Sequence, residues 1–424
     1  MISRKRIPLA ALAALAIAAP VAGQSPAAEP VNLRFGTYAF QPTTVAATEQ
    51  IVADWNAANP AIQVELVTID VNSVHDSLVT QFQGGTTPDI IHDEAADLAG
   101  FVEQGFLADM TALVPETLKA DVPEGIWDSV TYDGKVFASP TLLQSYVVFA
   151  NKKLLDAAGI AVPTIDAPWT WDDFATNAKA LTKDGQYGLC WGLKSAGALV
   201  MSTSLGYGGT FFATDGDTTT FQFGPAEQQV PTRIHDMAYT DGSIDPSTIG
   251  ASGSDNLAVF LADRCAMFVG GNFYAQQLTD SAPDGFEWVM LPLLKGDAQT
   301  QNANPQTLSI AAQSEHPAEA MQFIDFFSNA KNLASVAQGD WLAPATTSAG
   351  AAVLAATGGA SGWDVIVSSS KLLAQAPFQK LEGYPQWKDQ TLNPSLQQYF
   401  ANQIDLATLT TQLTDGWNTV AAGQ

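Results

Sequence analysis

The residues of this chain whose types could do chemistry are polar and aromatic side chains that follow short apolar runs. Tyr38 and Phe40 follow one run, and Asp93 and Glu94 follow a later run of the same kind. A carboxylate accepts hydrogen bonds from vicinal hydroxyl groups, and an aromatic ring packs against apolar C–H groups. These residues predict a binding site for a polyhydroxylated molecule. For Asp93 the alternative is the N-cap of the following helix.

Residue patterns typical of catalysis or of a metal centre do not occur. The sequence has four His residues, and none has a metal-ligand spacing to another. The G-x-S-x-G, H-E-x-x-H and P-loop patterns are also missing. His92 beside Asp93 could be a base and its orienting partner, but a polar loop end is the simpler interpretation. We expect binding without catalysis, cofactor or metal. A glycosidase carboxylate pair stays open because Asp and Glu number 43.

Strands and helices must alternate to position these side chains. The apolar spacing switches between a period of two and a helical period through the first hundred residues, which is typical of an α/β protein with a parallel sheet covered on both faces. Ligands of such sheets bind beyond the carboxyl ends of the strands, here in loops 37–41, 68–71 and 92–97. The predicted strands are 31–35, 62–66 and 89–91, and the predicted helices are 44–59, 74–82 (capped by Ser73) and 98–102.

The rest of the chain shows the same mixture of elements. Residues 210–220 are rich in Thr and Gly and predict a turn. We also predict strands at 147–149 and 266–269, and helices at 172–181, 257–261, 318–328 and 396–420.

Length and charge limit the architecture and the partners. A chain of 424 residues is too long for one ordinary core, so two lobes are expected. The formal net charge of −25 argues against binding to nucleic acid or to an anionic membrane surface. Cys190 and Cys265 form either a disulfide, which an oxidising compartment permits, or two buried thiols.

The first residues predict export from the cytoplasm. Arg4, Lys5 and Arg6 precede an apolar run over residues 7–22 that ends in small residues. This is the pattern of a cleaved signal peptide, which we place at residues 1–23. The apolar run is shorter than the roughly 20 residues that span a bilayer. Because no Cys lies near the junction, we expect a periplasmic protein that is not a lipoprotein.

Several local patterns, in order along the chain, resemble one known family. The chain resembles the family 1 extracellular solute-binding proteins, the maltose-binding-protein-like group of ABC importers. Two residues depart from the family patterns: Ala150 stands where a Tyr is usual, and Phe273 stands where a Trp is usual. The matching segments are 83–91, 132–140, 148–160, 168–174, 260–268, 271–273, 291–292 and 314–320.

The resemblance implies two α/β lobes of the periplasmic-binding-protein fold, joined by a hinge that the chain crosses several times. By this analogy a ligand binds between the lobes, and closure reports its presence to the ABC permease in the membrane. The implied protein is a monomeric receptor that captures a sugar. The implied N-terminal lobe is residues 24–143 and 300–345, the C-terminal lobe is residues 144–299 and 346–424, and the crossings lie near 140–145, 297–305 and 340–346.

The resemblance also adds candidate ligand-binding residues to Tyr38, Phe40 and Asp93. Gln144 lies at the first crossing, where a hinge hydrogen bond is the alternative. For Trp191, in a glycine-bounded segment, the alternative is a core position. Phe273 keeps a stacking face but lacks the N–H group of the usual Trp. The added candidates are Gln144, Trp191, Asn272, Phe273, Trp341, Tyr384 and Trp387, the last two in a loop before the C-terminal helices.

Two other functions compete with a sugar receptor. One is the same receptor for a polyol, a glycerol phosphodiester or another small polar solute. A phosphate would require Arg or Lys in the cleft. Among the loops predicted to form the cleft, only Lys194 provides a nearby cation. A phosphorylated ligand is therefore disfavoured. The other is a secreted enzyme acting on glycosides, which would need a catalytic constellation.

Overall fold

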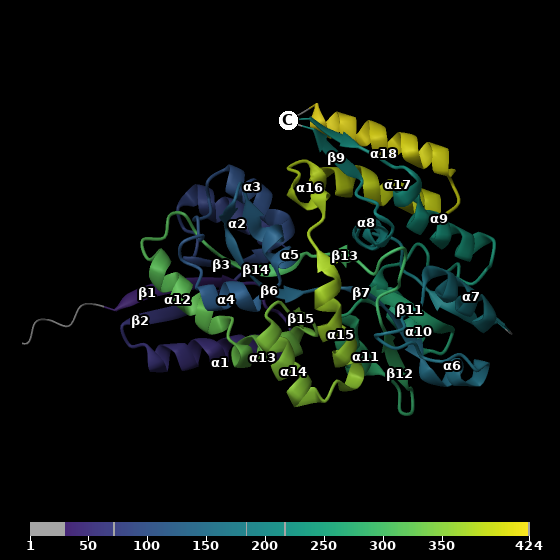
Figure 1. Ribbon diagram of the computed structural model, residues 1–424, viewed down its shortest axis with the longest axis horizontal. Coiled ribbons are helices and arrows are strands. Elements are labelled where there is room, and N and C mark those ends of the chain that lie inside the picture. The colour runs from purple at the N-terminus through teal and green to yellow at the C-terminus, as the bar shows by residue number, and fades with distance from the viewer. Residues whose placement is uncertain (1–29, 71–72, 184, 216–217, 423–424) are drawn as a thin grey trace, which may run out of the picture.

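The protein is built around two β-sheets, each with helices packed on it (Figure 1). The computed structural model describes residues 30–70, 73–183, 185–215 and 218–422. The predicted signal peptide lies outside these residues. Within them, no helix is both long and apolar enough to cross a membrane.

The first sheet has six strands in the order β15-β6-β14-β3-β1-β2. β1 pairs in parallel with β2 and β3, as predicted. β14 pairs antiparallel with both β3 and β6, so strands from later in the chain make the sheet mixed. The strands are β1 (Val31–Thr37), β2 (Ile62–Thr68), β3 (Ile90–Glu94), β6 (Ala138–Leu143), β14 (Pro305–Ile310) and β15 (Ala343–Pro344).

Helices cover both faces of this sheet because its buried residues alternate. Ile90 packs in one apolar cluster with α1, α12 and α13, whereas its neighbour Ile91 packs in another with α2 and α3. Figure 1 shows α1 and α13 on one side of the sheet and α2 and α3 on the other. These helices are α1 (Pro42–Ala58), α2 (Val74–Gly84), α3 (Leu98–Glu103), α12 (Pro317–Phe327) and α13 (Ala330–Asp340).

The second sheet has four strands in the order β12-β7-β11-β8. β11 runs antiparallel to β7 and parallel to β8. Cys190 on β8 and Cys265 on β11 form a disulfide with a Cα–Cα distance of 5.6 Å, which settles the alternative left open by the sequence. The strands are β7 (Tyr146–Asn151), β8 (Tyr187–Cys190), β11 (Cys265–Gly271) and β12 (Trp288–Leu291).

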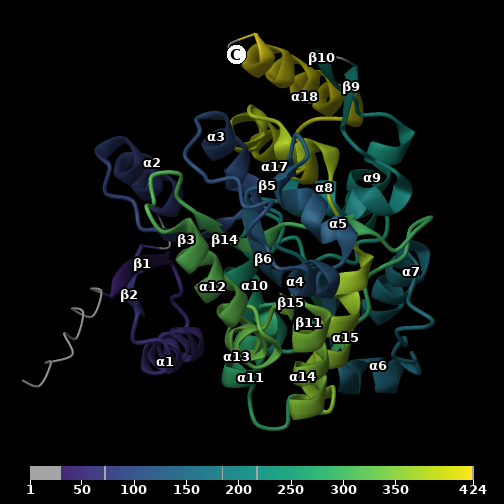
Figure 2. The same ribbon diagram turned by 60° about the vertical axis from the view of Figure 1, so that its left-hand side comes forward.

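The same alternation places helices on both faces of the second sheet. Phe149 faces the apolar cluster that also contains the core of the first sheet, and Val148 faces a cluster with the C-terminal helices. Figures 1 and 2 show α17 and α18 together at the top of the molecule. The remaining helices include α6 (Lys152–Ala158), α7 (Trp171–Leu181), α8 (Gly197–Ser204), α9 (Pro225–Tyr239), α10 (Gly253–Leu261), α11 (Tyr274–Ser281), α14 (Thr347–Thr357), α15 (Trp363–Ser369), α16 (Tyr384–Trp387), α17 (Asn393–Phe400) and α18 (Leu406–Ala421).

Two connections between the sheets matter for the site. Gln144 and Ser145 join β6 of the first sheet to β7 of the second. The short strand β13 (Gln301–Asn302), which precedes β14, pairs in parallel with β16 (Leu373–Ala374). The segments near 140–145 and 297–305 therefore run from one sheet to the other. The division of the chain into two moving lobes stays a prediction.

Two elements differ from the sequence-based expectation. Within the segment predicted as a turn, β9 (Phe212–Asp215) and β10 (Thr218–Phe221) pair as antiparallel strands. The tail is two helices, not one, because Asn402 has a positive φ of 56° between them. The Asp405 carboxylate then caps α18 by accepting a hydrogen bond from the backbone N–H of Thr408 at 2.8 Å.

Candidate functional site

Two neighbouring cavities lie where the strands of the first sheet end. The acidic pocket, of about 320 Å³, is lined by Tyr38 after β1, by the start of α2, and by Asp93 and Glu94 at the end of β3. The cleft pocket, of about 240 Å³, shares Glu94 with it. Their position agrees with the rule that ligands bind beyond the carboxyl ends of parallel strands.

The walls of the cleft pocket come from both sheet units. Glu94 belongs to the first sheet, whereas Tyr146 on β7, Ser202 on α8 and Tyr384 on α16 belong to elements packed on the second. Gln144, between the two sheets, also lines it. A molecule bound here would therefore contact both units at once.

Hydrogen bonds fix the amide groups of the cleft pocket. Asn304 donates from Nδ2 to the Glu94 carboxylate at 3.0 Å. Its Oδ1 accepts from the backbone N–H of Ala96 and from Nε2 of Gln379, both at 3.0 Å. Each group keeps further hydrogen-bonding capacity, so the pocket presents oriented donors and acceptors to a polar ligand.

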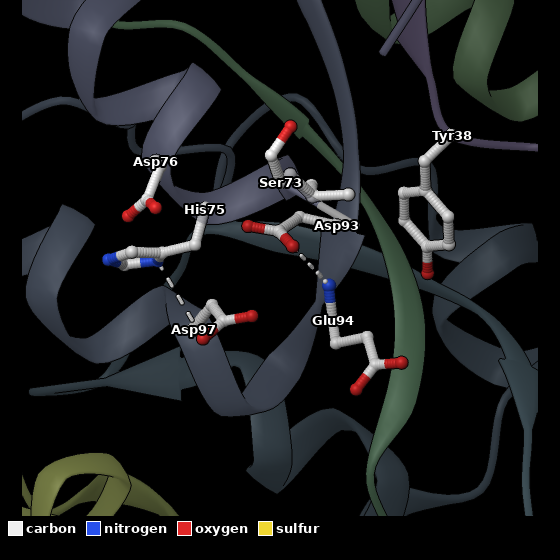
Figure 3. A pocket seen from close by; sticks show the side chains of 8 residues that line it. Tyr38, Ser73, His75, Asp76, Asp93, Glu94 and Asp97 are labelled. Atoms are coloured by element: carbon white, nitrogen blue, oxygen red, sulfur yellow. Dashed lines mark hydrogen bonds and ion pairs between the residues drawn. The ribbon is translucent and has the colours of Figure 1, made fainter. Parts of the chain in front are cut away.

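The acidic pocket is lined by four carboxylates (Figure 3). Asp93 is only 2% exposed, and its Oδ1 accepts a hydrogen bond from the backbone N–H of Glu94 at 2.9 Å. Nδ1 of His75 lies 3.7 Å from the Asp97 carboxylate. The four acidic residues are Asp76, Asp93, Glu94 and Asp97.

Burial and mutual repulsion shift the protonation of these groups. Burial raises the pKa of Asp93 well above its usual value, and the neighbouring Asp97 raises it further. The pKa of Glu94 is raised in the same way, although its hydrogen bond from Asn304 opposes the shift. Burial also raises the pKa of Asp97, against the opposing effect of His75 and Lys388. Burial and repulsion thus favour the neutral, protonated form of these carboxyl groups, and a positive charge brought into the pocket would favour the ionised form.

A buried aromatic pair supports one wall of the acidic pocket. The Tyr38 ring stacks on the His92 ring with centroids 4.1 Å apart. The His92 imidazole contacts Thr37 Oγ1 at 3.0 Å and Gln306 Oε1 at 3.2 Å. Burial lowers the pKa of His92 to about 4, so this ring is neutral near pH 7. These contacts hold His92 as a support for Tyr38 and argue against its role as a base.

The comparison with known proteins decides the family. The model of the bacterial extracellular solute-binding protein family matches residues 41–334. The chain belongs to this family. The resemblance drawn from the sequence patterns is therefore confirmed.

Individual relatives agree with this assignment. The chain is 39% identical over 407 residues to an uncharacterised lipoprotein in the oleD 5′ region of Streptomyces antibioticus, covering 95% of this chain and 90% of the relative. It is 23% identical over 236 residues to the mannitol-binding protein of Pseudomonas aeruginosa, covering 53% and 52% of the two chains. One of these relatives is named a lipoprotein and the other a binding protein.

Solved structures share the two-lobe fold. The sugar-binding protein MalE of Xanthomonas citri superposes with a TM-score of 0.80 at 18% identity, over 93% of this chain and 98% of that one. The cyclic α-maltosyl-1,6-maltose binding protein of Arthrobacter globiformis gives a TM-score of 0.80 at 17% identity, over 93% and 100%. The predicted periplasmic-binding-protein fold is confirmed.

The structure of this solute-binding protein brings four of the sequence-predicted residues to the two pockets. Tyr38 and Asp93 line the acidic pocket, and Gln144 and Tyr384 line the cleft pocket. Tyr384 lies in the short helix α16, where the sequence predicted a loop. The side chain of Asp93 makes no helix cap, because the residue that precedes the next helical turn is Glu94.

Three predicted aromatic residues lie elsewhere. Trp387 is fully buried, and its indole N–H donates to the carbonyl oxygen of Leu413 at 3.0 Å, so its place is in the core. Trp191 is also buried, and it lines a cavity of only about 20 Å³. Phe40 is 64% exposed and is not among the described residues that line either pocket.

The other three predicted residues lie near the connections between the sheets. Asn272 is buried, and its Oδ1 accepts from the backbone N–H of Ser145 at 3.2 Å. Phe273 contacts the Tyr274 ring, with centroids 4.5 Å apart. Trp341 has a positive φ of 54° and stacks on Trp363 at 5.0 Å. Within the described part of the chain, none of these three lines the acidic or the cleft pocket.

Sequence reasoning missed several polar residues of the pockets. It placed Lys194 nearest the cleft, but among the described residues that line the cleft pocket the cation is Lys388, directly after Trp387. It also missed His75 and Asp76 at the start of α2. Asn302 and Asn304 lie in the segment 297–305, which was predicted as a crossing between the lobes. Their position in the sequence could therefore have identified them as candidate site residues. Over the described residues, no group of three or more His, Cys, Asp or Glu is arranged to hold a metal ion.

Proposed function

We propose that this protein is the extracytoplasmic receptor of an ABC importer, and that it captures a sugar in the cleft pocket and delivers it to the permease. The observation that favours this function is the composition of the cleft pocket. Glu94, Asn304 and Gln379 offer donors and acceptors with fixed orientation, and Tyr146 and Tyr384 offer aromatic surface. Sugar hydroxyls and C–H faces need these two kinds of partner.

The position of the pocket supports a mechanism by closure. Because its walls belong to both sheet units, a ligand that contacts Glu94 on one side and Tyr384 on the other binds the closed form better than the open form. A ligand shifts a conformational equilibrium only by such a difference in affinity. The proposed lobes, residues 24–143 with 300–345 and residues 144–299 with 346–424, would move as rigid bodies about the connections near Gln144 and Gln301.

Relatives at low identity support carbohydrate-like ligands. A relative in Halalkalibacterium halodurans is an arabinooligosaccharide-binding protein, and one in Streptococcus mutans is a multiple sugar-binding protein. The mannitol-binding relative favours a polyol as the second candidate ligand. The proposed role involves binding alone, with no catalytic step.

The test is a thermal-shift screen of the mature protein against monosaccharides, oligosaccharides and polyols, followed by calorimetry of each hit. A ligand that binds only the folded state raises the melting temperature. Gln144→Ala is expected to weaken the hit roughly 2- to 10-fold, the effect of one lost hydrogen bond. Gln386→Ala, which removes an exposed amide outside the pocket lining, is the matched control. A flat response to every carbohydrate and polyol would refute the proposal.

We propose further that residues 1–23 direct export and are removed. The Streptomyces antibioticus relative is named a lipoprotein, which makes a lipid-anchored form the competing outcome. The mass of the mature N-terminus decides between them. A start near residue 24 without added lipid supports a free receptor, whereas a lipid-modified N-terminus would refute it.

A further inference from the structure

Acidic residues outnumber basic residues among the described residues that line the acidic pocket. Asp76, Asp93, Glu94 and Asp97 all line it, and in the view of Figure 3 the carboxylates of Asp76 and Asp97 lie next to the His75 ring. Among the described lining residues there is no Lys or Arg. His75 contacts Asp97 at 3.7 Å, and the nearest influence from an ammonium group comes from Lys388 in the neighbouring cleft pocket.

Two buried polar atoms in this pocket lack a partner. The Oδ2 atom of Asp93 and the hydroxyl of Tyr38 make no hydrogen bond to any described residue. Asp93 is 2% exposed and Tyr38 is 8% exposed, and both line the pocket. A buried polar group without a partner is unfavourable in a folded protein and calls for a physical explanation. A ligand with hydrogen-bond donors would supply the missing partner to both atoms.

An organic cation is a kind of donor that suits the carboxyl groups of this pocket. The carboxylates of the pocket are not arranged as a metal site within the described residues. A protonated primary amine has three N–H donors and one positive charge, and it hydrogen-bonds to acceptors spaced around it. The Asp93 carboxylate, whose Oδ2 has no partner among the described residues, is an acceptor of this kind.

The position of the cleft pocket indicates which kind of molecule carries the amine. Glu94 lines both pockets, so a sugar ring in the cleft pocket would lie beside the acidic pocket. We propose that the acidic pocket binds the ammonium group of a cationic amino sugar whose ring occupies the cleft pocket, with Asp93 and Asp97 as its partners. This inference rests on the proposed function and narrows its ligand from sugars in general to amino sugars. The positive charge of the ligand would then offset the unfavourable burial of the Asp93 carboxylate next to Asp97.

The test uses matched sugars that differ only in the amine. The probes are D-glucosamine with N-acetyl-D-glucosamine and D-glucose, and chitobiose with N,N′-diacetylchitobiose, each titrated into the mature protein by calorimetry. The free amines are expected to bind roughly 10- to 100-fold more tightly than their neutral counterparts, because a charge-assisted hydrogen bond contributes an affinity difference of this size. Added NaCl should weaken the amines and leave the neutral sugars unchanged.

A pair of variants locates the effect. Asp97→Asn is expected to remove most of the preference for the amine. The control variant is Asp415→Asn, on the exposed face of α18, which makes the same change in net charge at a position distant in the sequence. It should leave the preference for the amine intact. Melting curves of both variants establish that they fold. If the two variants behave alike, the amine is not recognised in the acidic pocket, and the inference is wrong.

The outcomes separate this inference from the proposed function. Neutral sugars that bind as tightly as the amines would overturn the inference and leave the sugar receptor standing. If no member of either series binds, the inference is also overturned. The wider carbohydrate and polyol screen then decides the proposed function by itself.

Discussion

Reduction of the Cys190–Cys265 disulfide is expected to destabilise the part of the protein built on the four-stranded sheet. The bridge joins β8 to β11 across a sequence separation of 75 residues, and both Cys side chains are fully buried. In the chain-entropy model, a cross-link that closes a loop of this length removes about 4 kcal/mol of conformational freedom from the unfolded state. The folded state keeps its strand pairing, so the free energy of unfolding should fall by roughly that amount on reduction.

Equilibrium unfolding in urea measures this change. The oxidised protein is compared with protein that has been reduced in denaturant and refolded in dithiothreitol, and thiol titration verifies the state of both Cys. Tryptophan fluorescence follows the unfolding of both sheet units, because Trp171 and Trp191 stack beside the second sheet and Trp55 packs in the core of the first. The double variant Cys190→Ala with Cys265→Ala is the control, since dithiothreitol should leave its transition unchanged. Equal midpoints for oxidised and fully reduced wild-type protein would show that the loop-entropy argument does not hold here.

Two further predictions concern single residues. Asp93→Asn should raise the stability of the unliganded protein at neutral pH by about 1–3 kcal/mol, because it removes a buried charge that is desolvated and repelled by Asp97. Because the folded-state pKa of Asp93 is raised, the stability of the wild-type protein falls as pH rises above 3.8 through that pKa. The melting temperature gained by the variant should therefore shrink toward pH 4. A variant that is less stable than wild type at neutral pH would contradict this reasoning. Gly188→Ala should destabilise by about 1–3 kcal/mol or more, since its Cβ would lie 1.9 Å from the Ala178 carbonyl oxygen. Gly250→Ala has no atom within 4 Å of its Cβ and should stay within about 0.5 kcal/mol of wild type, and urea unfolding of both variants checks the contrast.

The sequence was sufficient to predict the elements that place the acidic pocket. Strands β1, β2 and β3 and helices α1, α2 and α3 begin within a few residues of their predicted starts. Each has a strong period of two or of 3.6, and residues such as Pro60 and Gly85 end the runs. Once the strands were known to be parallel, the loops after β1 and β3 had to meet at one edge. Tyr38 and Asp93 do line one pocket.

Local patterns could not predict contacts between distant segments. β14 lies between β3 and β6 and runs antiparallel to both, which depends on the path of the chain through the second sheet unit. Trp387 was predicted as a ligand-binding aromatic, but it packs against Phe212 and Trp417, which come from a hairpin and from the last helix. Burial of a Trp depends on such tertiary neighbours. An aromatic residue in an apparent loop is therefore a weak indication of a binding site.

The position of Glu94 explains how one ligand could act on both pockets. Its backbone N–H holds the Asp93 carboxylate, and its own carboxylate accepts from Asn304 and is influenced by Lys388 of the second sheet unit. A cation in the acidic pocket would lower the repulsion among Asp93, Glu94 and Asp97, and this would favour the ionised form of Glu94 toward Lys388. Since Lys388 belongs to the opposite wall, the attraction between the walls would grow when the pocket is filled. In the proposed receptor, ligand charge and closure are thus coupled through a single carboxylate.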